Sequence, residues 1–150
     1  MSRIYFDCFS GASGDMIVGS LLDLGLPLDQ LAGELQKLNL RNYSLSATKV
    51  VKAGVAATKF NVHIGHEHVH RNYFMIESII RESTLSDRVK DSATRIFLRL
   101  AEAEARVHGS TVDKIHFHEV GAVDAIIDIV NDAGAHQPVA VFHGGQHPHR

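Results

Sequence analysis

The chain has 150 residues, of which 45% are apolar, and its formal net charge is −2 with histidine neutral. A chain of this length and apolar content can bury a hydrophobic core without cross-links, which excludes global disorder. The single cysteine, Cys8, excludes an internal disulfide and a multi-cysteine zinc site, and the lack of a basic stripe argues against nucleic-acid binding.

We expect a cytoplasmic protein with no membrane association. The first residues have no basic stretch followed by a long apolar segment, which a secretory signal peptide would need. The longest apolar runs are also far shorter than the roughly 20 residues that a membrane-spanning helix requires.

The first part of the chain predicts a strand, a glycine-rich loop and two helices. Residues 4–9 read as a short buried strand, and residues 10–15 form a loop of small residues after it. A helix is expected over residues 14–24, with Ser13 as a candidate N-cap. After Pro27, a second helix is indicated by apolar residues at helical spacing: Leu28, Leu31, Leu35 and Leu38.

The middle of the chain predicts a β-hairpin, a loop and a helix. Residues 43–51 and 55–64 read as strands that are separated by a short turn. The histidine-rich segment 66–71 is expected to be a loop, and residues 72–82 a helix.

The last part predicts two helices and an irregular tail. The strongest helical pattern covers residues 87–107, residues 114–120 read as extended, and residues 122–130 read as a helix. Residues 131–150 contain Gly, Pro and His without periodicity and read as a disordered tail outside the domain formed by residues 1–130. The order of elements predicts an α+β or α/β fold, a two-layer sandwich of a small mixed sheet with helices.

The glycine-rich loop is a candidate phosphate site. Free backbone N–H groups and the positive end of a helix dipole both favour an anion at such a loop. The residues assigned to cofactor binding are Ser10, Gly11, Ser13, Gly14 and Asp15. The loop is not a Walker motif, and the alternative is a tight turn in which Ser13 caps the helix. Asp7, at the end of the preceding strand, is a candidate metal ligand or nucleophile.

Two groups among the eleven histidines indicate metal binding. Neutral imidazole suits nickel, copper and zinc. His66, His68 and His70 could gather round an ion in a mobile loop, although a solvated polar loop is the alternative. His116 and His118 share one face if their segment is extended.

Acidic residues follow the second histidine pair. Glu119 is expected at a turn, and Asp124 and Asp128 lie one turn apart on the next helix. Two imidazoles with such carboxylates can bind nickel, zinc or manganese. The alternatives are that Asp124 only favours the helix N-terminus and that His116 is a hydrogen-bonded core residue.

Two segments together strongly resemble the nickel-insertion protein family. They are residues 6–17, FDCFSGASGDMI, and residues 116–130, HFHEVGAVDAIIDIV. Members of this family supply Ni(II) to pyridinium-3,5-bisthiocarboxylic acid mononucleotide and so make the nickel-pincer cofactor of lactate racemase and related enzymes. The resemblance covers roughly residues 1–130, and the sequence departs from the family pattern after Val130.

The resemblance implies a CTP-dependent insertase that forms carbon–nickel and sulfur–nickel bonds. It implies a second, carboxy-terminal domain or partner chain, to which we assign CTP and its Mg(II) or Mn(II), and it leaves open a homo-oligomer. The metal ligands expected here are His66, His68, His70, His116, His118 and Asp128. The candidates for catalytic work, including removal of the proton from the metallated ring carbon, are Asp7, Glu119 and Asp124.

Two other functions fit the same residues. A metal-dependent phosphohydrolase would use Asp7, His116, His118 and Asp124 around one or two ions. A non-enzymatic nickel store, or a structural half that awaits its partner chain, would need the metal ligands alone.

Overall fold

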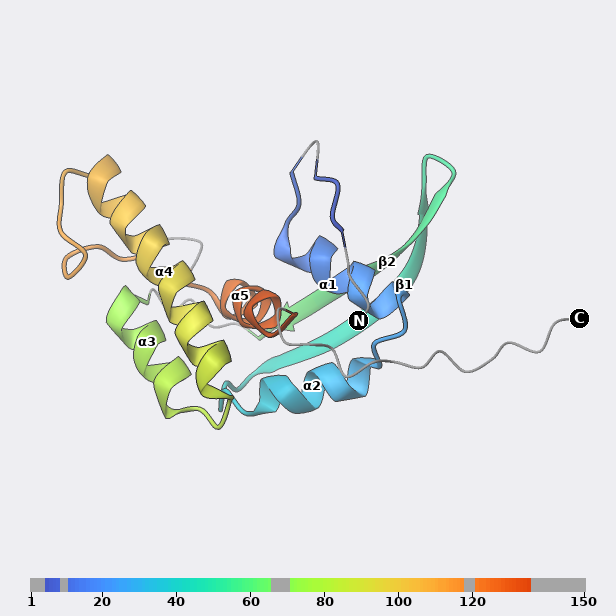
Figure 1. Cartoon of the computed structure of the whole chain (residues 1–150), viewed down its shortest axis with the longest axis horizontal. Coiled ribbons are helices and arrows are strands. Elements are labelled where there is room, and N and C mark those ends of the chain that lie inside the picture. The colour runs from blue at the N-terminus through green and yellow to red at the C-terminus, as the bar shows by residue number, and fades with distance from the viewer. Residues whose placement is uncertain (1–4, 9–10, 66–70, 118–120, 136–150) are drawn as a thin grey trace, which may run out of the picture.

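The computed structural model describes residues 5–8, 11–65, 71–117 and 121–135. Five helices and two strands follow one another along these residues (Figure 1). Their bounds are α1 (Gly14–Asp23), α2 (Leu28–Gln36), β1 (Tyr43–Lys52), β2 (Val55–Ile64), α3 (Tyr73–Glu82), α4 (Asp87–Val107) and α5 (Val123–Ala135). The mixture of helices with a small antiparallel sheet confirms the predicted α+β class.

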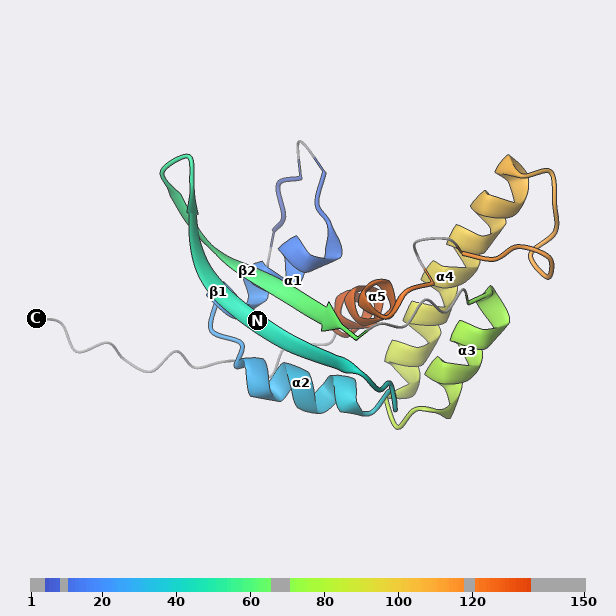
Figure 2. The same cartoon turned by 180° about the vertical axis from the view of Figure 1, so that it is seen from behind.

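A long antiparallel hairpin forms the sheet of the described residues. Its register pairs Tyr43 with Ile64 at the open end and Lys52 with Val55 at the tip. The two turn residues, Ala53 and Gly54, both have positive φ, at 51° and 80°. Two-residue turns of this kind match the right-handed twist of the strands, which explains why so short a turn suffices. Figures 1 and 2 show the tip standing clear of the helices.

Helix α1 lies directly on the hairpin because one of its residues has no side chain. A Cβ added at Gly19 would overlap the backbone carbonyl oxygen of Thr58 on β2. Val18 of α1 is completely buried, and Phe60 of β2 is 1% exposed. The missing Cβ therefore lets the helix approach the strand closely enough for the neighbouring apolar side chains to be sealed from water.

Helix α5 lies at the centre of the molecule, between the α1–hairpin unit and the α3–α4 pair (Figures 1 and 2). Ile126 and Ile127 of α5 are completely buried. The largest side chains that are sealed in the core come from most of the elements: Phe60, Phe97, Phe117, Leu35, Leu38, Ile76, Ile80, Ile126, Ile127 and Val18. Burial of this apolar surface is what holds α5 in place.

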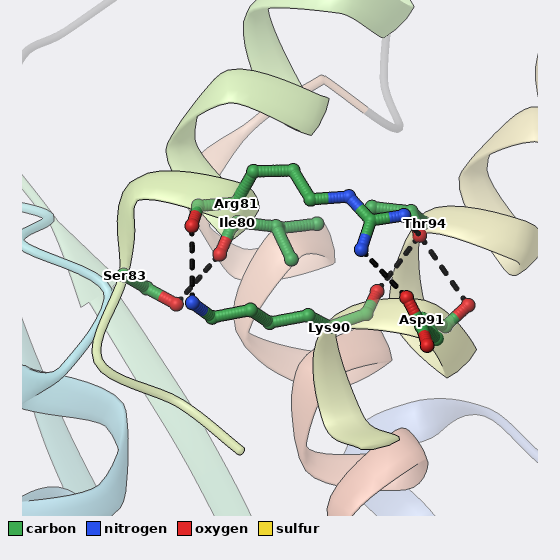
Figure 3. Close-up of polar contacts among 6 residues, drawn as sticks. All are labelled: Ile80, Arg81, Ser83, Lys90, Asp91 and Thr94. Carbon is green, nitrogen blue, oxygen red and sulfur yellow. Dashed lines mark hydrogen bonds and ion pairs between the residues drawn. The ribbon is translucent and has the colours of Figure 1, made fainter. Parts of the chain in front are cut away.

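Helices α3 and α4 form an antiparallel pair whose connection is held by side chains. The Asn72 side chain caps α3 by accepting a hydrogen bond from the Met75 N–H, 2.9 Å away. At the other end, Arg81 Nη1 donates to Asp91 Oδ1 at 2.6 Å, and Lys90 Nζ donates to the Arg81 carbonyl at 3.0 Å (Figure 3). These contacts fix the end of α3 against the beginning of α4.

The first expected strand is not formed in its described part. Residues 5–8, the described part of the predicted segment 4–9, have no regular structure. Tyr5 is 88% exposed and Phe6 is 42% exposed. A strand needs a neighbour for its backbone hydrogen bonds, and the sheet of the described residues consists of β1 and β2 alone. The sheet of the described residues is purely antiparallel, so the expectation of a mixed sheet was wrong.

Two boundaries near the end of the chain also differ. Lys114, expected to begin an extended segment, lies in a turn that its N–H closes on the Thr111 carbonyl at 3.0 Å, and residues 115–117 pair with no strand among the described residues. Helix α5 continues to Ala135, past the end predicted at residue 130, because Val130 and Ala133 continue its buried face. The rest of the predicted tail, residues 136–150, lies outside the described residues.

None of the helices in the described ranges combines the length and the apolar character that crossing a lipid bilayer requires.

Candidate functional site

The first turn of α1 touches the middle of α5 at a glycine. A Cβ added at Gly14 would come within 2.6 Å of the Asp128 Cβ and 3.0 Å of its carboxyl carbon. The backbone N–H of Asp15 donates a hydrogen bond to the Asp128 carboxylate. Gly14 therefore leaves the space in which an acidic side chain of α5 reaches the amino-terminal end of α1.

Asp128 lies in an environment that disfavours its negative charge. Partial burial, followed by the negative charges of Asp15, Asp132 and Asp124, raises the pKa of Asp128 to about 7, and the Asp15 N–H offsets this only in part. The Asp128 Oδ1 atom is buried and has no hydrogen-bond partner among the described residues. A proton or a cation at this oxygen would relieve both the desolvation and the repulsion.

Three of these carboxylates follow one another along α5. Asp124, Asp128 and Asp132 are spaced four residues apart, which places them along one side of the helix. Asp124 is exposed in the first turn, where its Oδ1 accepts a hydrogen bond from the Ala125 N–H at 2.8 Å. This is the arrangement expected of a carboxylate that stabilises a helix N-terminus.

The glycine-rich loop before α1 is a turn that leads into the helix. Gly11 has φ +85°, and its N–H donates to the Cys8 carbonyl at 2.9 Å. Ser13 occupies the predicted N-cap position, but its hydroxyl donates to Asp15 Oδ1 and does not cap the helix. With the Asp15 and Asp128 carboxylates beside it, the helix N-terminus would hold a phosphate more readily if a cation were bound at the same time.

Arg71, which follows segment 66–70 in the sequence, contacts the two residues that flank segment 118–120. The Phe117 N–H donates to the Arg71 carbonyl at 3.1 Å, and Arg71 Nη1 donates to the Gly121 carbonyl at 3.1 Å. A Cβ added at Gly121 would lie 3.1 Å from both the Arg71 carbonyl oxygen and the Phe117 Cβ. The residue that follows segment 66–70 is therefore packed between the two residues that flank segment 118–120.

His116 is exposed, while Phe117 beside it is 1% exposed and lies with its ring centroid 6.3 Å from that of Phe97. The Phe117 side chain anchors the segment in the core and leaves the imidazole at the surface. His116 is therefore not the buried core histidine that was considered as an alternative.

Several predicted site residues lie outside the described residues, and the metal centre is not formed by those that are described. The residues outside are Ser10, His66, His68, His70, His118 and Glu119. Among the described residues, no group of three or more His, Cys, Asp or Glu side chains is arranged to hold a metal ion. Asp7 is exposed in the irregular segment before α1.

The sequence reasoning missed two residues that the structure brings into the site. Asp132 adds a fourth carboxylate to the group, and its spacing from Asp128 would have revealed it had the helix been extended past residue 130. Arg71 carried no recognisable signal, because its role depends on a contact with residues far away in the sequence.

The family model and the similar curated proteins point to the same family. Residues 4–141 match the model of the nickel insertion protein family. A relative from Geobacillus kaustophilus, named pyridinium-3,5-bisthiocarboxylic acid mononucleotide nickel insertion protein, is 51% identical over 143 residues, covering 89% of this chain and 35% of the relative. A relative of the same name from Desulfitobacterium hafniense is 49% identical over 130 residues, covering 87% of this chain and 32% of the relative.

A relative from Geotalea uraniireducens is 53% identical over 135 residues, covering 89% of this chain and 35% of the relative. The chain thus spans about a third of the length of these curated relatives. No solved structure gives a significant match to the chain.

Proposed function

The chain belongs to the nickel insertion protein family, and from this premise we propose that it binds Ni(II) and delivers the ion to pyridinium-3,5-bisthiocarboxylic acid mononucleotide. The product would be the nickel-pincer cofactor of lactate racemase-type enzymes. Nickel is here a substrate that passes through the protein. The names of two relatives support the mononucleotide as its acceptor.

One observation carries the proposal that the two histidine-rich segments act together. Arg71 is bonded to Phe117 through its carbonyl and to Gly121 through its guanidinium group. Segments 66–70 and 118–120 are attached to these contacting residues by the chain itself. The proposed ligands are His66, His68, His70, His116, His118 and Asp128, which supply the imidazole and carboxylate groups that Ni(II) accepts.

Asp128 is suited to bind a metal ion, because a bound cation would offset the unfavourable burial and repulsion of its negative charge. Its pKa is raised to about 7, so nickel would compete with a proton for a carboxylate whose Oδ1 lacks a partner among the described residues. The carboxylates proposed for the removal of the ring proton are Asp7, Glu119 and Asp124, of which Asp7 and Asp124 are exposed.

We further propose that the complete reaction needs a carboxy-terminal domain in addition to these 150 residues. The chain spans about a third of its curated relatives, which leaves ample length for a domain that binds CTP with Mg(II) or Mn(II). In this proposal the chain gathers and presents nickel, and insertion requires both parts.

Equilibrium dialysis against Ni(II) tests the metal site. The His116→Ala and His118→Ala variants, and a variant in which His66, His68 and His70 are all alanine, should each bind nickel at least about tenfold more weakly or with lower stoichiometry. His108→Ala is the matched control, because His108 is exposed at the end of α4 and pairs with Glu104 at 3.2 Å. Unchanged nickel binding in every variant would contradict the site.

Reconstitution tests the need for a second domain. The chain alone, the carboxy-terminal domain of a relative alone, and their mixture are assayed with the mononucleotide, Ni(II) and CTP. We expect the nickel-containing product from the mixture and none from either part. Product from the chain alone would contradict the proposed division of labour.

A further inference from the structure

A second charged site lies on the α3–α4 pair. A depression of about 910 Å³, open to solvent, is lined by six residues: Arg81, Arg88, Asp91, Ser92, Thr94 and Arg95. All six side chains are polar, and they comprise three guanidinium groups and one carboxylate. The surplus of positive charge is local, since the whole chain has a formal net charge of −2.

Contacts across the two helices hold part of this depression in one arrangement. Arg81 of α3 donates to Asp91 Oδ1 at 2.6 Å and to Thr94 Oγ1 at 3.2 Å, both on α4 (Figure 3). The carbonyl of the same Arg81 accepts a hydrogen bond from Lys90 Nζ at 3.0 Å. Because Arg81 is held at its side chain and at its backbone, its guanidinium group is oriented before any ligand arrives.

The remaining arginines are placed to add charge from α4. Arg88 and Arg95 are seven residues apart, close to two helical turns, so both lie on the side of α4 that lines the depression. Arg88 is in the first turn of α4, where the helix dipole also favours a negative group. Guanidinium groups suit phosphate because their planar N–H donors match two phosphate oxygens at once.

We propose that this depression binds the phosphate groups of a small molecule. The lining side chains are all polar or charged, and the three guanidinium groups together with the Ser92 hydroxyl suit a small, highly charged anion. The ligand class is therefore a phosphorylated metabolite, a nucleotide or inorganic pyrophosphate, all of which present the same phosphate oxygens. The site is separate from the acidic group around Asp128.

Isothermal titration calorimetry of the whole chain with inorganic pyrophosphate at low ionic strength tests the proposal. The wild-type chain should bind pyrophosphate with a Kd below about 1 mM, and Arg95→Gln should weaken binding roughly tenfold, since a charge-assisted hydrogen bond is lost. Arg106→Gln removes the same charge in the last turn of α4 and should leave the Kd within about twofold. Circular dichroism checks that each variant remains folded.

Three outcomes would overturn the site: no pyrophosphate binding by the wild-type chain, an unchanged Kd in Arg95→Gln, or equal weakening by Arg95→Gln and Arg106→Gln. Equal weakening would mean that the overall positive charge of α4, and not a specific site, attracts the anion. A second titration with a nucleoside diphosphate distinguishes the ligands. Tighter binding than pyrophosphate supports a nucleotide, and equal binding supports recognition of the phosphate groups alone.

Discussion

Gly14 and Asp128 are in contact although they lie near opposite ends of the chain, and a Cβ on Gly14 would be 2.6 Å from the Asp128 Cβ. This contact joins the first turn of α1 to α5. It also keeps the Asp128 carboxylate close to the Asp15 N–H, which donates to it. Substitutions on either side of the contact should therefore affect both stability and the charge of the site.

Gly14→Ala should destabilise the fold by about 1–3 kcal/mol, the usual cost of forcing a methyl group into a packed contact. Urea unfolding followed by circular dichroism measures the change. Gly33→Ala is the control, because Gly33 lies inside α2 and a Cβ there would meet nothing within 4 Å. That substitution should stabilise the protein by up to about 1 kcal/mol through helix propensity, so a loss of similar size in both variants would refute the contact.

Asp128→Asn should make the metal-free protein more stable at pH 8 but not at pH 4. The folded-state pKa of Asp128 is raised to about 7, so the wild-type folded state holds its proton over a range in which the unfolded state has lost it. Stability that this proton provides is present at pH 4 and is lost as the pH rises through about 7. Because the side chain is partly solvated, we expect a gain on the order of 1–2 kcal/mol at pH 8.

The measurement is the free energy of unfolding in urea at pH 4, 6 and 8 in the presence of a chelator. Asp29→Asn, at an exposed position in the first turn of α2, controls for the loss of one negative charge. If the Asp128→Asn difference does not change with pH, the carboxylate is not in the environment described.

Arg71→Ala should weaken nickel binding about three- to tenfold and cost about 1 kcal/mol of stability. The substitution removes the hydrogen bond from Arg71 Nη1 to the Gly121 carbonyl, which joins the residues that flank segments 66–70 and 118–120. Calorimetric titration with Ni(II) measures the affinity. Arg41→Ala, at an exposed position before β1, should change neither quantity; equal effects of both substitutions would remove support for the special role of Arg71.

Ala53→Gly should stabilise the hairpin by up to about 1 kcal/mol. Ala53 has φ 51°, a left-handed conformation that costs a residue with a Cβ about 1–2 kcal/mol, whereas glycine adopts it freely. The gain is reduced by the greater freedom of glycine in the unfolded chain. Thermal unfolding gives the comparison, with Ala57→Gly in β2 as a control that should be destabilising.

Local sequence patterns were sufficient for the elements that local interactions determine. The hairpin was predicted over residues 43–51 and 55–64 and is found at Tyr43–Lys52 and Val55–Ile64. The long helix over residues 87–107 has the predicted bounds, because its apolar face, first-turn acid and terminal glycine all lie within its own sequence.

Patterns of this kind were misleading where structure depends on a distant partner. Residues 5–8 look like a strand but have no strand beside them among the described residues, and α5 passes the expected end because its buried face continues. The raised pKa of Asp128 could not be read from the sequence either. It arises from burial and from the nearby charge of Asp15. The contact between α1 and α5 brings Asp15 close, and these helices are far apart in the sequence.

The absence of a side chain at Gly19 ties the hairpin to the acidic group. Because Gly19 has no side chain, α1 lies directly against the Thr58 carbonyl. The amino-terminal end of the same helix places Gly14 and Asp15 next to α5. A larger residue at position 19 would push α1 away from the strand and should therefore also displace Gly14 and Asp15 from Asp128.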